Sequence, residues 1–261
     1  MSKHSVFAFV GGDRRQVYVI LGLAENGCEV RVIGLSSPEL EMTSNITMCS
    51  SLHRAVSGAD YIVLPVPYSS VLSSENINTP LYNKEIRLTD LFTERQELSG
   101  KLILAGRVDE RLTALANLYG AQTADYMERE ELAVLNAIPT AEGAVKIAMD
   151  ELPVTLHGSH CLVTGFGRVS KILCATLKGM GVHVTTAVRK KSDMAYITAY
   201  GYDCIDIRQP IANAKQYDVV FNTVPKLIIG EGILTALRSD CLIIDLASKP
   251  GGADFYLDKA R

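Results

Sequence analysis

The sequence predicts an α/β protein with two Rossmann-like, doubly wound parallel-sheet domains joined by a helical connector. Two observations indicate this fold class. Short apolar runs alternate with segments of helical period, first over residues 1–135 and again over residues 154–261. In each half the first apolar run ends in a glycine turn that leads into a helical segment, as in a βαβ unit with parallel strands.

The first domain, residues 1–135, contains five apolar runs of strand length. The polar stretch 69–90 has no sustained period and is expected to be a loop. Gly27 fits the end of the first helix. We expect strands at 5–10, 28–35, 60–65, 102–105 and 122–125, and helices at 14–26, 52–57 and 110–118.

The connector, residues 136–153, belongs to a longer helical stretch that starts near residue 127. Pro139 lies inside it, and proline removes a helix hydrogen bond and collides with the preceding turn, so we expect a break or kink there. The second domain, residues 154–261, then repeats the alternation. We expect strands at 160–164, 183–188, 204–206, 218–222 and 241–246, and helices at 168–180, 192–200, 211–216 and 233–237.

Composition excludes several classes of function. The chain has 261 residues, 48% of them hydrophobic, and a net charge of −3 with a pI near 6.0, so neither a nucleic-acid surface nor a membrane patch is expected. No apolar run is expected to cross a bilayer, and no signal peptide is expected at the N-terminus. Six scattered cysteines indicate free thiols in the cytoplasm, and the pair His157 and His160 has no companion ligand, so no metal is expected.

The turn after the strand at 160–164 reads Gly165-Phe166-Gly167. In a dinucleotide site the first glycine makes the tight turn, the second lets the backbone approach a pyrophosphate, and the helix N-terminus supplies free N–H groups. The third position is Ser170, which is still small. A glycine turn required only by sterics is the alternative, and the strand–turn–helix context favours nucleotide binding.

Arg189, Lys190 and Lys191 stand where NAD-binding proteins place an acidic residue for the ribose hydroxyl. An arginine there can pair with a 2′-phosphate, so the sequence favours NADP, with NAD as the other choice. Asp193 could reverse this preference, and a solvated basic turn is the alternative.

Arg14 and Arg15 open the first helix of the first domain, where cations oppose the helix dipole. The two arginines suit an anion site for a carboxylate, although each could simply face solvent. In open α/β sheets, ligands lie outside the carboxyl ends of the strands. Other candidates at strand ends are 65–70, Gly106-Arg107, 222–225 and 245–252.

Several segments together resemble the family of the dipicolinate synthase A chain, an oxidoreductase of spore-forming bacteria. They are GGDRRQ (11–16), LNAIPTAEGAV (135–145), LVTGFGRVS (162–170), FNTVP (221–225) and IIDLASKPGG (243–252). The second half is more distantly similar to the cofactor domains of 2-hydroxyacid dehydrogenases, alanine dehydrogenase and adenosylhomocysteinase.

The resemblance implies NADP-dependent oxidation of a dihydrodipicolinate-type intermediate of the lysine pathway to dipicolinate. It also implies a small dicarboxylate substrate and, as partner, the flavoprotein-like B chain of dipicolinate synthase. The location that it implies is the cytoplasm of the mother cell of a sporulating bacterium. Expected cofactor-binding residues are Gly165, Phe166, Gly167, Arg168, Val169, Arg189, Lys190, Asn222, Thr223, Val224 and Pro225. Expected substrate residues are Arg14, Arg15, Asn136, Thr140 and Lys249.

Glu142 is the candidate general base, and a first-turn helix carboxylate without that role is the alternative. Thr140 and Glu142 are expected just past a break at Pro139, where backbone N–H groups would be freed. Members of the family run on past the position of Arg261, so we expect a C-terminal segment of the family to be missing here. Other readings are a non-catalytic dinucleotide-binding protein of the same complex, or a different NAD(P)-dependent 2-hydroxy or amino acid dehydrogenase. The sequence also leaves open whether the protein forms a homo-oligomer.

Overall fold

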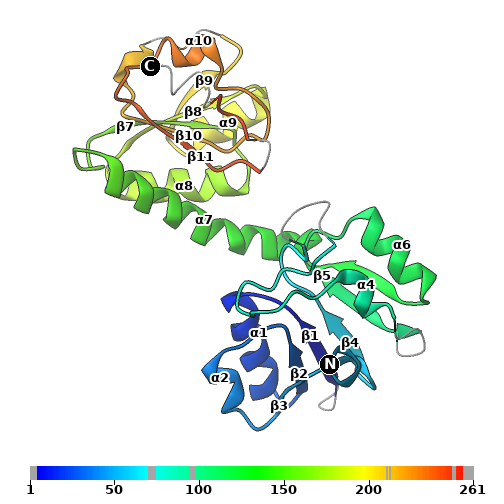
Figure 1. The fold of residues 1–261 in the computed structure, drawn as a ribbon. Helices are drawn as coiled ribbons and strands as arrows, with labels where there is room; N and C mark the ends of the chain where they lie inside the picture. The colour runs from blue at the N-terminus through cyan, green and yellow to red at the C-terminus, as the bar shows by residue number, and fades with distance from the viewer. Residues whose placement is uncertain are drawn as a thin grey trace. The chain divides into compact units, whose positions relative to one another are not determined.

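The computed structural model describes residues 5–69, 75–93, 98–209, 211, 213–248 and 251–254. The chain forms two compact units, Met1–Arg129 and Glu130–Arg261 (Figure 1). Each unit holds one sheet in which every paired strand runs parallel. The predicted fold class, α/β with two doubly wound parallel sheets, is therefore what the backbone shows.

The first unit carries a sheet of six strands in the order β3-β2-β1-β4-β5-β6. The strands are β1 Val6–Val10, β2 Glu29–Ile33, β3 Ile46–Met48, β4 Tyr61–Val63, β5 Leu102–Ala105 and β6 Gln122–Asp125. The helices are α1 Arg14–Glu25, α2 Pro38–Glu41, α3 Leu52–Val56, α4 Leu88–Leu91, α6 Glu110–Leu118 and the 3₁₀ turn η1 Tyr126–Glu128.

Both faces of this sheet are buried, as in other all-parallel sheets. Along β1, Phe7 and Phe9 join the core that packs against α1, whereas Ala8 and Val10 join the core on the opposite face. The topological switch point lies between β1 and β4, because successive strands are added on opposite sides of that pair. The short strand β3 and the helix α2 were not expected from the sequence, and α4 lies at the end of the predicted loop 69–90.

The second unit carries five strands in the order β11-β10-β7-β8-β9, with its switch point between β7 and β10. The strands are β7 His160–Thr164, β8 His183–Val188, β9 Asp203–Asp206, β10 Val219–Asn222 and β11 Leu242–Asp245. The helices are α7 Glu130–Glu151, α8 Arg168–Gly179, α9 Lys191–Ala199, α10 Glu231–Leu234 and the 3₁₀ turn η2 Ala214–Gln216.

Helix α7 is continuous through Pro139, so the predicted break in the connector is wrong. The helix packs beside α8 in the core of the second unit (Figure 1). Its buried face is built from small residues, Ala141, Ala144 and Ala148 among them, which allow close approach. Packing of this face supports the helix, and the missing proline N–H removes only one hydrogen bond.

Helix α7 is also the one helix among the described residues that is long and apolar enough to cross a bilayer, with 22 residues and a mean hydropathy of 1.2. No such run was expected from the sequence. This helix is partly buried, and its alanine face belongs to the core of the second unit. By length and composition alone a core helix passes the same test, so this one is weak evidence for a membrane span.

Candidate functional site

The glycine turn of the second unit lies at the topological switch point, directly after β7. Gly165 has a φ of +83°, and its N–H donates to the carbonyl of Ala187 at 2.9 Å. A Cβ at Gly165 would lie 2.8 Å from Val224 Cγ2 and 2.9 Å from Thr223 Oγ1. Only glycine fits this position without strain, so the tight turn and the loop after β10 are packed together.

Gly167 has a different role in the same turn. It is the N-cap residue of α8, no side chain caps the helix there, and a Cβ at Gly167 would meet nothing within 4 Å. The free N–H groups at the start of this 12-residue helix therefore border open space. Ser170, at the position of the third glycine, is fully buried and donates to the carbonyl of Gly165 at 2.7 Å. An open helix N-terminus of this kind suits a phosphate group.

The residues that flank the turn have partners of their own. Arg168 forms an exposed ion pair with Glu130 at 2.9 Å, which links the starts of α8 and α7. The ring of Phe166 lies under the ammonium group of Lys171, 5.3 Å from ring centroid to nitrogen. Val169 is half-buried. The turn is thus held on its outer side by α7, α8 and their side chains.

A basic segment follows β8. Arg189 and Lys190 are exposed, and neither side chain makes a hydrogen bond or ion pair with the described residues. The acidic residue at the end of the next strand, Asp206, is paired with Arg208 at 2.6 Å, which lowers the pKa of Asp206 to about 2. Asp193 lies in the first turn of α9, where its charge favours the helix dipole.

The ends of β7, β10 and β11 are joined by a network of side-chain hydrogen bonds. Asn222 is fully buried, and its amide oxygen accepts from Thr164 Oγ1 at 2.5 Å and from the N–H of Val224 at 3.2 Å. Its amide nitrogen donates to Asp245 Oδ1 at 2.7 Å and to the carbonyl of Val224 at 3.1 Å. All four hydrogen-bonding positions of this amide are used, so Asn222 holds the loop 223–225 rather than reaching outward.

Asp245, the first residue of the candidate segment 245–252, completes this network. Burial alone would raise the pKa of the Asp245 carboxyl, but hydrogen bonds from Gly252, Ala247, Asn222 and Ala253 lower it overall. Its position at the end of a strand is the signal that marked this segment as a candidate, because all such ends meet at one edge of the sheet.

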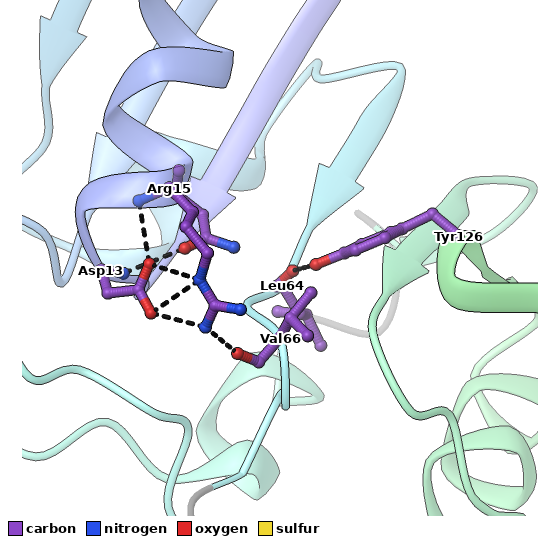
Figure 2. Close-up of polar contacts among 6 residues, drawn as sticks. Asp13, Arg15, Leu64, Val66 and Tyr126 are labelled. Carbon is purple, nitrogen blue, oxygen red and sulfur yellow. Dashed lines mark hydrogen bonds and ion pairs between the residues drawn. The ribbon is translucent and has the colours of Figure 1, made fainter. Parts of the chain in front are cut away.

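In the first unit, the two arginines at the start of α1 behave differently. Asp13 caps the helix, and Arg15 binds the Asp13 carboxylate through Nε and Nη2 at 2.6–3.1 Å (Figure 2). Arg15 Nη2 also donates to the carbonyl of Val66 at 2.5 Å, across the switch point between β1 and β4. Arg14 is exposed and lies 3.8 Å from Glu39. The guanidinium of Arg15 lowers the pKa of Asp13, and the capping carboxylate offsets the cations at this helix N-terminus.

Tyr126 is a member of this site that was not expected from the sequence. Its hydroxyl donates to the carbonyl of Leu64 at 3.0 Å (Figure 2). Burial raises the pKa of Tyr126, which keeps the phenol protonated. No sequence motif marks this tyrosine, because the turn η1 that carries it follows an edge strand with no glycine signal.

Three predicted residues lie on α7. Asn136 and Glu142 are exposed, and Thr140 donates its hydroxyl proton to the carbonyl of Asn136 at 2.9 Å. Because α7 begins at Glu130 and has no break, Glu142 is a mid-helix residue. The expected freed N–H groups after Pro139 and the first-turn alternative for Glu142 are both wrong. Lys249 lies outside the described residues.

A groove of about 700 Å³ in the first unit runs along α6 and β6. Four carboxylates line it, those of Asp109, Glu110, Asp125 and Glu128, and no lysine or arginine does. This groove does not suit an anionic ligand. His160, one of the two histidines noted in the sequence, stacks on His183 with ring centroids 4.6 Å apart. No group of three His, Cys, Asp or Glu side chains in the described part of the chain could hold a metal ion.

Comparisons with known proteins agree with this architecture. The structure matches that of a transhydrogenase from Sinorhizobium meliloti with a TM-score of 0.64 and 16% sequence identity. The match covers 96% of this chain and 81% of the transhydrogenase chain. The structure also matches D-lactate dehydrogenase from Salmonella, with TM-score 0.56, 14% identity and coverage of 96% of this chain and 73% of that one. These likenesses confirm the predicted fold, that of two-domain dehydrogenases.

Closer likenesses concern a single family. The crystal structure of the dipicolinate synthase A chain from Bacillus halodurans matches 98% of this chain and 86% of its own, with TM-score 0.88 and 26% identity. The dipicolinate synthase A chain of Bacillus subtilis strain 168 is 29% identical over 97% of this chain and 84% of its own length. The family model for the N-terminal domain of the dipicolinate synthase A chain matches residues 6–127. Over nearly its whole length, the chain is therefore similar to the dipicolinate synthase A chain.

Proposed function

We propose that this chain oxidises a dihydrodipicolinate-type intermediate of the lysine pathway to dipicolinate, pyridine-2,6-dicarboxylate, with NADP+ as hydride acceptor. The observation that carries the proposal is the open glycine turn between β7 and α8, in a chain that is similar to the dipicolinate synthase A chain over nearly its whole length. The two-domain dehydrogenase fold supports the same class of reaction.

The glycine turn fits a dinucleotide on two counts. The N-terminus of α8 has free N–H groups beside open space at Gly167. Thr164, Thr223 and Asn222 fix the two loops on either side of the switch point, so the turn is ordered before a ligand binds. We assign the pyrophosphate to Gly165–Val169 and the adjoining wall of the site to the loop Thr223–Pro225.

Arg189 and Lys190 favour the phosphorylated form of the cofactor. Both are exposed after β8, without partners among the described residues, and Asp206 on the neighbouring strand is already paired with Arg208. No free carboxylate at the end of β9 therefore competes for the cations. A guanidinium group can bind a phosphate bidentately, which makes Arg189 the first choice for the 2′-phosphate.

The substrate is a small dicarboxylate, and we place its recognition on the first unit. Arg15 is oriented by Asp13 and the carbonyl of Val66, and its Nη1 makes no hydrogen bond with the described residues. Arg14 supplies a second positive charge near the same helix start. The family resemblance assigns substrate binding to three further residues, Asn136, Thr140 and Lys249.

The reaction removes a hydride and a proton from the dihydropyridine ring and gives an aromatic product, so the protein mainly holds the ring in place. When bound, NADP+ accepts the hydride. Glu142 on α7 is the candidate that receives the ring proton; its side chain is exposed, in the middle of the helix.

The relatives are named as one lettered component of a synthase, which supports a second polypeptide as partner. We propose that this partner is the flavoprotein-like B chain of the same synthase. We expect both to act in the cytoplasm of a sporulating cell. The described residues form no disulfide, which suits a reducing compartment.

The first experiment is a calorimetric titration of NADP+ and NAD+ into the wild type and into Arg189→Ala. Loss of one charged, bidentate contact should weaken NADP+ binding by about 1.5–3 kcal/mol and change NAD+ binding little. Arg238→Ala is the matched control, because Arg238 pairs with Asp218 at the amino end of β10, opposite the glycine turn.

The outcomes separate the parts of the proposal. Equal losses for both nucleotides would remove the 2′-phosphate role from Arg189 and leave the glycine turn as the binding element. If the wild type binds neither nucleotide, the dinucleotide assignment itself fails. Turnover of the dihydro intermediate with NADP+, measured with and without the B chain of the synthase, then tests the substrate; binding without turnover in both cases would favour a non-catalytic role.

A further inference from the structure

Arg107 has an unusual backbone conformation. Its φ is +64°, in the left-handed region that glycine and, less often, asparagine adopt. Among the described residues, only Arg107 and Asn213 combine a side chain with a positive φ. An arginine in this region costs free energy that glycine would not, so the side chain requires an explanation.

The backbone on both sides of Arg107 is held in place. Gly106 donates its N–H to the carbonyl of Pro65 at 3.2 Å and accepts from the N–H of Tyr68 at 3.2 Å. A Cβ at Gly106 would collide with the side chain of Val66. On the other side, Val108 donates its N–H to Asp125 Oδ2 at 2.8 Å. The neighbours of Arg107 therefore impose the left-handed conformation.

Two further bonds secure the segment just after Arg107. Asp109 caps α6 by accepting from the N–H of Leu112 at 2.9 Å, and it accepts from the hydroxyl of Tyr68 at 2.7 Å. The turn is thus fixed by its own packing and does not use the Arg107 side chain. That side chain is exposed and makes no hydrogen bond or ion pair with the described residues.

Strained residues that the fold over-determines occur most often at functional sites. Arg107 stands at the carboxyl end of β5, the edge at which parallel sheets bind ligands. Val66 connects it to Arg15: Gly106, next to Arg107, packs on the Val66 side chain, and Arg15 donates to the Val66 carbonyl at 2.5 Å. Two guanidinium-bearing residues therefore flank the end of β4.

We infer that Arg107 is a specificity-determining residue that binds one of the two carboxylates of the substrate, while Arg15 binds the other through its free Nη1. This inference rests on the proposed function, which supplies the dicarboxylate. It explains why arginine occupies a position that glycine fits better. A guanidinium group binds a carboxylate through paired N–H donors, and a rigid turn limits the entropy lost on binding.

The test compares pyridine-2,6-dicarboxylate with the monocarboxylate pyridine-2-carboxylate. Both are titrated calorimetrically, with NADP+ present, into the wild type, Arg107→Gly and Arg107→Lys. The wild type should prefer the dicarboxylate. Arg107→Gly should weaken dicarboxylate binding at least tenfold and leave monocarboxylate binding within about twofold, because one charged contact is lost. Arg107→Lys keeps the charge without the paired donors and should fall between the two.

A thermal unfolding curve provides the readout that a merely structural role would not produce. Arg107→Gly removes the left-handed strain, so its midpoint should equal or exceed that of the wild type while dicarboxylate affinity falls. Arg54→Ala, an exposed arginine on α3, is the charge-matched control and should change neither quantity.

Unchanged preference for the dicarboxylate in Arg107→Gly would overturn the inference and leave the proposed function intact. A lower midpoint together with equal losses for both ligands would also overturn it, by showing a structural role. If the wild type binds neither pyridine acid, both the inference and the proposed substrate fail, whereas the NADP+ titration of Arg189→Ala still stands on its own.

Discussion

The side-chain amide of Asn222 donates to the carboxylate of Asp245 over 2.7 Å, and this bond joins the ends of β10 and β11. Asp245 also accepts from the N–H groups of Ala247, Gly252 and Ala253 at 2.7–3.1 Å. One carboxylate thus fixes two loops at the carboxyl edge of the sheet. Because Asn222 in turn bonds Thr164 before the glycine turn, the order of the proposed nucleotide site depends on this pair.

Asp245→Asn should destabilise the protein by about 1–3 kcal/mol in urea unfolding at neutral pH. Each oxygen of Asp245 accepts two hydrogen bonds, so an NH₂ group at either position would face two donors. The matched control is Asp240→Asn, an exposed residue that pairs with Arg238 among the described residues, and this change should cost less than about 0.5 kcal/mol.

The same pair predicts a pH dependence. The pKa of Asp245 is lower in the folded chain than in the unfolded one, where a free aspartate has a pKa of about 3.9. The folded state binds fewer protons, so this stabilisation is complete above the unfolded pKa and is lost as pH falls through the folded pKa. Urea unfolding between neutral pH and the acid limit of folding should show a smaller acid loss in Asp245→Asn; parallel curves would contradict the role of this carboxylate.

The two glycines of the turn should respond differently to alanine. Gly165→Ala places a Cβ 2.8 Å from Val224 and requires a left-handed backbone, so we expect a loss of about 1–2 kcal/mol or more in urea unfolding. Gly167→Ala meets open space at a φ of −84°, and its cost should be smaller, about 0.5–1 kcal/mol, because alanine is a poorer N-cap residue than glycine.

A binding measurement tests whether Gly167 contacts the dinucleotide or is a glycine for steric reasons alone. If a pyrophosphate approaches the backbone at Gly167, the methyl group of Gly167→Ala occupies that space, and NADP+ affinity should fall about tenfold or more, equivalent to about 1.4 kcal/mol. Wild-type affinity in a stable Gly167→Ala would show that the turn does not contact the dinucleotide at this residue.

Pro139→Ala should stabilise the protein. The proline is exposed within the continuous helix α7, so its ring has little packing to lose, and alanine restores the missing N–H. We expect a gain of about 1–3 kcal/mol in urea unfolding, reduced by the greater freedom of the unfolded chain. Asn136→Ala, one turn earlier and also exposed, is the control for helix propensity, and a loss of stability in Pro139→Ala would contradict the prediction.

The sequence alone determined the elements whose signals are local. The ranges 102–105, 110–118, 122–125 and 160–164 agree with β5, α6, β6 and β7. Apolar runs, helical periods and glycine turns act over a few residues, and the right-handed crossover restricts how such units join. The glycine turn and the basic segment after β8, on which the proposed dinucleotide site rests, were found in this way.

Only the tertiary structure decided how each side chain is used. Pro139 stays inside α7 because the alanine face of the helix packs against α8, although the local signal predicts a break. Asn222 is saturated by partners from two other strands, Arg15 is tied to Val66, and Arg107 is forced into a left-handed turn by contacts of its neighbours. These bonds join residues tens of positions apart, so their free energies depend on a register that no short window of sequence contains.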